Sequence, residues 1–587
     1  MPIAAETFFA TLAQRRWSLG DKRRSGSWSS AWEAIAAADP SLSSARVTVE
    51  LVFGGDCVVR AATEPVETRS GTTGEVYRYA PLLQSEPEVQ SEITIGGGGA
   101  ASLRAVTLSL DGRLVDPLAI VNGGRMLAGH GEVSIQIDGG DWDDRLVLLR
   151  GDMAGGVSFG RSDEILDFEI VDPESTVDLL VPPAVLTAGA FPLARAADHG
   201  RRFPLILTDH PAVPLLLINR IGARVYAVGI GSALASGTGA TIEVVSIYVD
   251  GIEYASTSTV YPWTQGEATD SASGYPLITV ESPGSGTGGA IDEDVEVYAR
   301  VQIAAGSSPD LLGVIRALLT EHSIVGVGGI DYDLFAASET RMPRGLSPKV
   351  IINGSGAGDA TRAIEYLEST IASDFPMVSF AWSGNGYAPV VADRRRGLYV
   401  ADLRRAQYPL IDRLSAISES PKADLLNAFT YRYGFDLVND SRAAVETRDA
   451  RSSLICRISE EGVGRRDGGV FDSVTVYDAA TAAYVVDWLV EHLALPHYVV
   501  EYEAFSILAL TLRLGDNLYL SDDLLGWERV EATVIGLRYQ RGRAVVRFAV
   551  WLLFANLPGG ARSGSGVTGG GGGGGGGGEG GEGGGNG

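Results

Sequence analysis

The chain has 587 residues, of which 45% are hydrophobic and 20% charged, so its length suggests about three to five globular domains. Asp and Glu number 73 against 47 Lys and Arg, and the resulting net charge of −26 argues against a general nucleic-acid binder, which needs cations to replace the counterions of phosphates. Only two cysteines are present, and neither a signal peptide nor an apolar run long enough to span a bilayer is visible, so we expect a protein made in the cytoplasm without a disulfide framework or membrane insertion.

The first part of the chain favours a short arm followed by a sheet. Residues 1–45 contain a basic, Ser-rich segment and are predicted to be an N-terminal arm. In residues 46–175, apolar and polar side chains alternate in several runs, most clearly at Arg46–Phe53 and Ile165–Val171, as they do in a half-buried antiparallel sheet. We predict a first, tube-like β-barrel over 46–175, with Gly96–Gly99 in a flexible insertion.

The middle of the chain changes from strands to a mixture of helices and strands. Residues 176–305 begin with a proline-rich connector and continue as a β domain, in which Asp250-Gly251 predicts a hairpin turn. Residues 306–400 read as an α+β domain. Its first helix is predicted to start with Ser308 as cap and Pro309 in the first turn, and its second to follow Asp359.

A second strand-rich region covers residues 401–557 and is predicted to be a second tube-like β-barrel. Its clearest strands are Leu512–Leu520 and Val530–Leu537, which alternate in the same way as the strands of the first region. One helix is expected inside it, with Asp478 as cap and Ala480–His492 as body.

Beyond residue 557 the chain loses all periodicity. Residues 558–587 include ten consecutive glycines at Gly569–Gly578, a composition typical of a disordered tail. The predicted fold class is therefore α+β and β-rich, with several domains: two antiparallel β-barrels that flank β and α+β modules, and a Gly-rich tail.

Motifs that could carry chemistry are weak. Gly156–Gly160 fits the G-x-S-x-G pattern, but a strand follows it instead of a helix, so strand alternation explains Ser158. Gly354–Gly358 lacks the spacing of a phosphate-binding loop. An acidic turn could hold a hard cation through carboxylate oxygens, although the other ligands of a calcium loop are missing; its residues are Asp138, Asp141, Asp143 and Asp144. The same carboxylates leave open an alternative, a β-rich hydrolase that degrades cell walls.

The main basic cluster has two interpretations. It is either a solvated face or an intersubunit contact with the acidic surplus of another copy, and it consists of Arg394, Arg395, Arg396, Arg404 and Arg405. No catalytic residue, cofactor or firm metal site is predicted, and the sequence does not indicate an enzyme.

Several segments follow one another in an order that is more informative than any single motif. They are Ile165–Pro173, Phe203–Leu217, Ile247–Gly251, Ser308–Leu319, Ile330–Phe335 and Leu512–Asp516. In this order they resemble a barrel strand ending in Asp-Pro, a V-P segment, a V-Y-V-D-G hairpin, a helix after S-P, an I-D-…-F element and an L-x-x-G-D strand of one family. That family is the tail-tip or baseplate hub proteins of long-tailed bacteriophages, and the resemblance covers roughly residues 130–557.

The resemblance implies a structural virion protein at the phage tail tip, made in the host cytoplasm. Three chains would form a pseudo-sixfold ring from two barrels each and join the tail tube and distal tail ring to a threefold tip. Implied partners are the distal tail protein, the tape measure protein and central fibre or tip proteins, with DNA passing through the lumen without sequence-specific binding. The insertions at 62–100 and 265–295 have no assigned role, and a secreted adhesin or carbohydrate-binding protein remains a further alternative.

Overall fold

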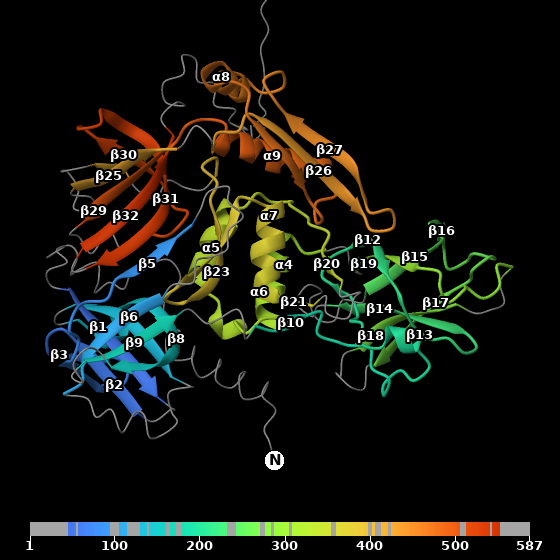
Figure 1. The fold of residues 1–587 in the computed structure, drawn as a ribbon, viewed down its shortest axis with the longest axis horizontal. Coiled ribbons are helices and arrows are strands. Elements are labelled where there is room, and N and C mark those ends of the chain that lie inside the picture. The colour runs from blue at the N-terminus through green and yellow to red at the C-terminus, as the bar shows by residue number, and fades with distance from the viewer. Residues whose placement is uncertain are drawn as a thin grey trace, which may run out of the picture.

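The computed structural model is β-rich, with few helices, in agreement with the predicted class. Two sheets lie one above the other on one side of the molecule, helices occupy the centre, and a second group of strands forms the opposite side (Figure 1). No helix in the part that the structure describes is long and apolar enough to cross a membrane. The described residues are 45–53, 57–93, 105–113, 129–137, 140–159, 165–171, 178–231, 242–269, 276–282, 287–303, 308–353, 360–396, 402–404, 413–420, 424–504, 512–540 and 543–551.

The first sheet has eight strands in the order β3-β4-β2-β1-β7-β8-β9-β6. Its strands are β1 (Ala45–Phe53), β2 (Cys57–Ala62), β3 (Val66–Arg69), β4 (Val76–Pro81), β6 (Ala105–Asp111), β7 (His130–Ile137), β8 (Leu146–Phe159) and β9 (Ile165–Val171). The alternation predicted for β9 is confirmed, because Leu166, Phe168 and Ile170 are buried. The segment after β4 links strands from both halves of this order: Asp111 donates its N–H to Leu82 O at 2.8 Å, and Leu83 donates to Ala62 O at 3.0 Å.

The second sheet has the order β24-β30-β31-β32-β29-β25. Its strands are β24 (Asp402–Arg404), β25 (Arg413–Glu419), β29 (Tyr498–Ala504), β30 (Asn517–Asp522), β31 (Trp527–Gln540) and β32 (Arg543–Val550). A seventh strand, β5 (Val89–Glu92), comes from the first part of the chain and pairs with β31. Buried side chains of both sheets form one continuous hydrophobic core. The interpretation of 62–100 as an inserted loop was therefore wrong, since this stretch holds β3, β4 and the strand that joins the two sheets.

Two further sheets pack against each other across a shared core on the other side of the molecule (Figure 1). One contains β17-β18-β14-β11-β20 with β13 paired to β14, and the other has the order β12-β19-β15-β16. Their strands are β11 (Leu205–Ile206), β12 (His210–Pro214), β13 (Leu216–Asn219), β14 (Arg224–Gly231), β15 (Ile242–Val249), β16 (Ile252–Tyr254), β17 (Thr264–Thr269), β18 (Pro276–Ser282), β19 (Val297–Ile303) and β20 (Ile351–Ile352).

Two sequence expectations for this region have different outcomes. The predicted hairpin is confirmed, because Asp250 and Gly251 turn between β15 and β16 with φ of 51° and 75°. The stretch 265–295 was expected to be a loop-like insertion with no assigned role, but β17 and β18 pair there, and Leu277 and Val280 of β18 are buried.

The centre of the molecule contains helices and a β-hairpin around a large hydrophobic core. Its elements are α4 (Leu311–Glu321), α5 (Tyr332–Arg341), α6 (Ala363–Tyr366), the π-helical turn η7 (Leu367–Ile371), α7 (Ala372–Asp374), β22 (Val378–Ser383) and β23 (Gly386–Val391). The predicted first helix is present, but its cap is Asp310, which accepts a hydrogen bond from Gly313 N at 2.8 Å. Ser308 instead accepts from Asp209 N. The short strands β10 (Leu180–Val181) and β21 (Thr361–Arg362) pair beside this module.

A separate, smaller sheet interrupts the second strand-rich region. The order is β27-β26-β28, and helices α8 and α9 accompany it. The elements are β26 (Ala428–Asp436), β27 (Ser441–Arg448), α8 (Leu454–Val463), β28 (Asp467–Asp472) and α9 (Ala479–Leu493). Asp478 caps α9 as predicted, accepting from Thr481 N at 2.8 Å. The range 401–557 thus contains two sheets instead of the one that was predicted. The predicted Gly-rich tail, and the predicted arm up to residue 44, lie outside the described residues.

Candidate functional site

The site begins at the turn Leu512–Asp516, which leads into β30. Gly515 has a φ of +78°, and its N–H donates to Val534 O at 2.8 Å. A Cβ at this position would lie 2.7 Å from Arg341 Nη1 and 2.9 Å from Val391 O. Only glycine therefore combines this backbone conformation with such close neighbours. The L-x-x-G-D pattern has a physical reason: the turn presses its backbone against helix α5 and strand β23.

Asp516 of this turn forms a buried ion pair with Arg341 at the end of α5. The two side chains are only 9% and 6% exposed. Asp516 also accepts from Arg513 N at 2.8 Å, and Arg341 donates to Leu514 O at 3.2 Å. Burial raises the pKa of Asp516 and lowers the pKa of Arg341, in each case against the attraction of the partner. Since the loss of hydration dominates for both groups, each charge depends on its partner in order to remain buried.

Asn517 connects the same turn to the segment that follows β23. Its amide nitrogen donates to Asp393 O at 2.9 Å and to Arg396 O at 2.7 Å. Its carbonyl oxygen accepts from the hydroxyl of Thr533 on β31, at 2.7 Å. The side chain is fully used and only 2% exposed, so it fixes the second sheet against the central module.

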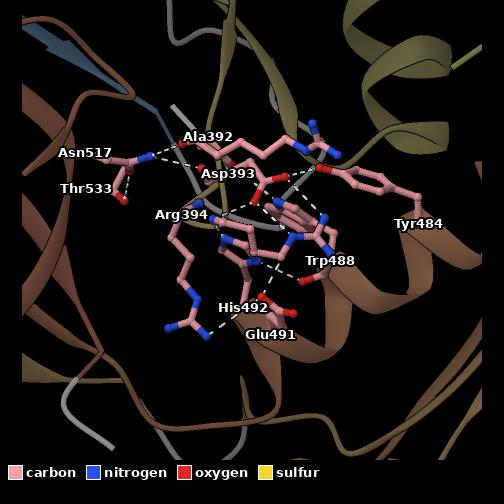
Figure 2. A network of polar contacts seen from close by, with 11 residues as sticks. Ala392, Asp393, Arg394, Tyr484, Trp488, Glu491, His492, Asn517 and Thr533 are labelled. Atoms are coloured by element: carbon pink, nitrogen blue, oxygen red, sulfur yellow. Dashed lines mark hydrogen bonds and ion pairs between the residues drawn. The ribbon is translucent and has the colours of Figure 1, made fainter. Parts of the chain in front are cut away.

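Asp393 lies at the centre of this junction, completely buried (Figure 2). It accepts from Arg395 through both carboxylate oxygens, at 3.0 Å and 3.2 Å, and from the hydroxyl of Tyr484 on α9. Burial opposes ionisation of Asp393, but Arg395 outweighs it and lowers the pKa of the carboxyl. Burial raises the pKa of the Tyr484 hydroxyl, so it remains a donor at neutral pH. Asp393 therefore ties the segment after β23 to helix α9.

Aromatic rings and a second carboxylate surround the two arginines. The guanidinium of Arg394 lies 4.0 Å from Glu491 and 5.3 Å from the centre of the Trp551 ring. His492 stacks on Trp488, which donates its indole N–H to Ala392 O at 2.9 Å. Burial lowers the pKa of His492 to about 3, so the ring is neutral at neutral pH. The cluster can hold together the second sheet, the segment after β23 and helix α9. Its groups are suited to positioning these elements and not to a reaction in solvent.

The structure places the predicted basic cluster partly inside the chain. Arg394 is only 8% exposed, and the side chain of Arg395, which also lies 3.7 Å from Glu491, is 20% exposed. Arg396 is exposed and lies 5.6 Å from the Tyr484 ring. The side chain of Arg404 and the whole of Arg405 lie outside the described residues. An intersubunit contact thus stays a proposal that concerns Arg396 above all.

The acidic turn holds a loop of the first sheet in place. Asp141 caps the short helix η3 (Trp142–Asp144) and accepts from Gly71 N at 2.8 Å. Asp143 accepts from the hydroxyl of Ser70 at 2.8 Å and from Thr72 N at 3.0 Å. Asp138 lies outside the described part. No group of three or more His, Cys, Asp or Glu among the described residues could hold a metal ion.

These contacts leave the hydrolase alternative without a supporting observation. Two of its four proposed carboxylates, those of Asp141 and Asp143, hold the loop of residues 70–72. Ser158 lies inside strand β8, in agreement with the sequence interpretation, and Gly354–Gly358 lies outside the described residues.

Sequence reasoning missed the residues that build the junction. Asp393, Arg341 and Asn517 come from three separate segments, and no local pattern marks any of them. The only signal was Gly515-Asp516, since a glycine followed by an acid before a strand is typical of a tight turn with a specific acceptor.

No protein-family model and no curated protein matches this chain. Among solved structures, a tail protein from Neisseria meningitidis MC58 is 11% identical, over 86% of this chain and 96% of that one, with a TM-score of 0.32. A chain from the virion of a native gene transfer agent is 12% identical, over 64% and 89%, with a TM-score of 0.39. A 43 kDa tail protein of prophage MuSo2 from Shewanella oneidensis is 9% identical, over 86% and 98%, with a TM-score of 0.34. TM-scores this low carry no argument for the function of this chain.

Proposed function

We propose that this chain is a structural virion protein, the hub of a phage tail tip or baseplate. The observation that carries this proposal is the pair of large, mostly antiparallel sheets from opposite ends of the chain, which share one hydrophobic core (Figure 1). A strand of the first part, β5, completes the second sheet. Two similar sheet units held side by side are what a threefold assembly needs in order to present six similar units around an axis.

In this proposal each sheet is a tube-like barrel. Leu82 O accepts from Asp111 N of β6, and Leu83 N donates to Ala62 O of β2. These hydrogen bonds support this for the first sheet, because they connect strands from the two halves of the strand order. The barrels correspond to residues 46–175 and to the parts of 401–557 outside the inserted β26–β28 module. The remaining ranges, 176–305 and 306–400, would place the two barrels in a larger body. The tail tip location and the homotrimer are part of the same proposal.

Charge pairing on the first sheet supports a conduit function. Glu132 accepts from the Nε atoms of Arg145 and Arg150, both at 2.7 Å, and Glu50 accepts from Arg60 at 2.7 Å. Burial opposes ionisation of Glu132, but Arg150 and Arg145 outweigh it and lower its pKa to about 2. Arginines neutralised in this way do not release counterions from DNA, and the net charge of −26 repels it.

The proposed lumen would therefore let a tape measure protein and then DNA pass without holding either. The proposed partners are the distal tail protein ring above the hub and central fibre or tip proteins below it.

The test is the oligomeric mass of the purified chain, followed by electron microscopy. Light scattering is expected to give three times the 61.7 kDa of one chain, and class averages along the axis are expected to show a ring with six similar units. A chain that stays monomeric at micromolar concentration, both alone and with the neighbouring tail proteins, would refute the proposal. Rings of any other symmetry would also refute it.

A further inference from the structure

Strand β5 comes from the first part of the chain and pairs with the second sheet. Its register with β31 comprises four residue pairs, from Val89 opposite Tyr539 to Glu92 opposite Gly536. Val89 is 5% exposed and belongs to the core shared by the two sheets, whereas Ile93 is 4% exposed and belongs to the core of the central module. Five residues, 89–93, thus anchor one segment in two different cores. Figure 1 shows β5 between the two large sheets.

Opposite charges hold β5 against the sheet. Glu88 lies 3.5 Å from Arg538 of β31, and Glu92 forms an ion pair with Arg547 of β32. Arg547 also lies 3.7 Å from Glu501 of β29, so one arginine serves two glutamates on either side of it. The strand also has its backbone pairing, which Ile93 extends by donating its N–H to Ile535 O at 2.8 Å, and the two apolar anchors.

Gly536 makes the contact between Arg547 and Glu92 possible. This glycine lies on β31 directly opposite both residues, with Glu92 on one side and Arg547 on the other. A Cβ on Gly536 would lie 3.1 Å from Arg547 Cβ and 3.5 Å from its Cδ. The missing side chain leaves the space in which the arginine reaches across its neighbouring strand.

Neither sheet depends on β5 for its own pairing. On β31 the residues before Val534 pair with β30, and the opposite edge of β31 pairs with β32 from Ala532 to Gln540. The first sheet has its own connection through Leu82 and Leu83. The charged side chains that hold β5 are between 29% and 43% exposed, so salt screens them.

We propose that β5 is a releasable strap. It detaches from β31 while both sheets and the hydrophobic core that they share stay folded. The inference does not rest on the proposed phage function, because it concerns the isolated chain alone.

Hydrogen exchange of the full-length chain, followed by mass spectrometry, tests the strap. The amides of residues 89–93 are expected to exchange at least tenfold faster than those of β32. High salt, or Glu92→Gln, should accelerate amide exchange in β5 by roughly another threefold to fivefold, which is the effect of losing one exposed ion pair. The exchange rates of β29 and β32 should not change. Glu67→Gln is the matched control, because Glu67 forms a comparable pair with Arg78 away from β5 and should leave its exchange unaltered.

A second variant closes the strap. Ser91 and Leu537 lie opposite each other in the register, so Ser91→Cys with Leu537→Cys can be oxidised to a disulfide. The oxidised form should slow exchange of β5 to the rate of β32, and reduction should restore the fast rate. If β5 and β32 exchange at the same rate in the wild-type chain at both salt concentrations, the strap opens only with the sheets and the proposal is overturned. Fast exchange that survives the disulfide would overturn it equally.

Discussion

Asp516→Asn removes one charge from the buried pair with Arg341 and leaves almost everything else in place. The amide oxygen can still accept from Arg513 N, so the main change is that the guanidinium, 6% exposed, loses its counter-charge. Breaking a buried ion pair on one side costs about 3–5 kcal/mol. We expect the lower end, about 3 kcal/mol, because Arg341 still donates to Leu514 O.

Urea unfolding measured by tryptophan fluorescence can detect this loss, since Trp527 lies in the affected sheet. With an m-value of about 3 kcal/mol/M, the midpoint of the transition that includes the second sheet should fall by about 1 M. Adding Arg341→Met removes the unpaired charge, and the double variant should recover to within about 1.5 kcal/mol of the wild type. A single variant that costs less than about 1 kcal/mol, or a double variant as unstable as the single one, would refute this reasoning.

Three more outcomes follow from individual residues. Gly515→Ala should destabilise the chain more than Gly526→Ala, measured by urea unfolding, because both have positive φ but only the first has neighbours within 3 Å of the new Cβ; equal losses would contradict the close contact. Above pH 4.5 the lowered pKa of Glu132 contributes up to about 3 kcal/mol of stability, which is lost as the pH falls toward 2. Glu132→Gln should therefore lower stability at pH 7 and flatten the acid dependence, and an unchanged pH profile would count against the pairing. Asp310→Ala should cost about 1 kcal/mol by the same assay, the usual value for a lost N-cap, and no loss would mean that the cap is redundant.

Local patterns predicted the local structure well. The alternation of Ile165–Val171 gave a strand with the expected buried face, and Asp250-Gly251 gave a hairpin because a two-residue turn with positive φ at both positions favours these residues. Helix α9 starts at its predicted cap. In each of these cases the determining interactions lie within a few residues of one another, so a single stretch of sequence contains the information.

Contacts between distant segments could not be predicted in this way. The strand Val89–Glu92 is short and polar, and it becomes a strand because β31, more than 400 residues later, offers it an edge. The same holds for the sheet of β26, β27 and β28, which divides one predicted barrel region into two parts. Alternation indicates that a strand exists, but its period is the same whichever sheet receives it.

The candidate site shows the same limit for polar residues. Arg394 and Arg395 were noticed because three arginines in a row are conspicuous, yet their surroundings are set by Asp393 and Glu491, one adjacent in sequence and one on a distant helix. A run of charges does not indicate whether it faces solvent. Here Arg394 is buried beside Glu491, and Arg395 is largely covered because it lies against Asp393 and the Tyr484 ring.

Besides the hydrophobic core that it shares with the first sheet, the second sheet has two polar connections of different physical character. At the turn that carries Asp516 and Asn517, the groups are almost fully buried, and breaking any one of them leaves an unsatisfied charge or amide. At β5, the ion pairs are partly exposed and water can replace each partner. High salt should therefore detach β5 from β31 before it loosens the junction at Asp516 and Asn517.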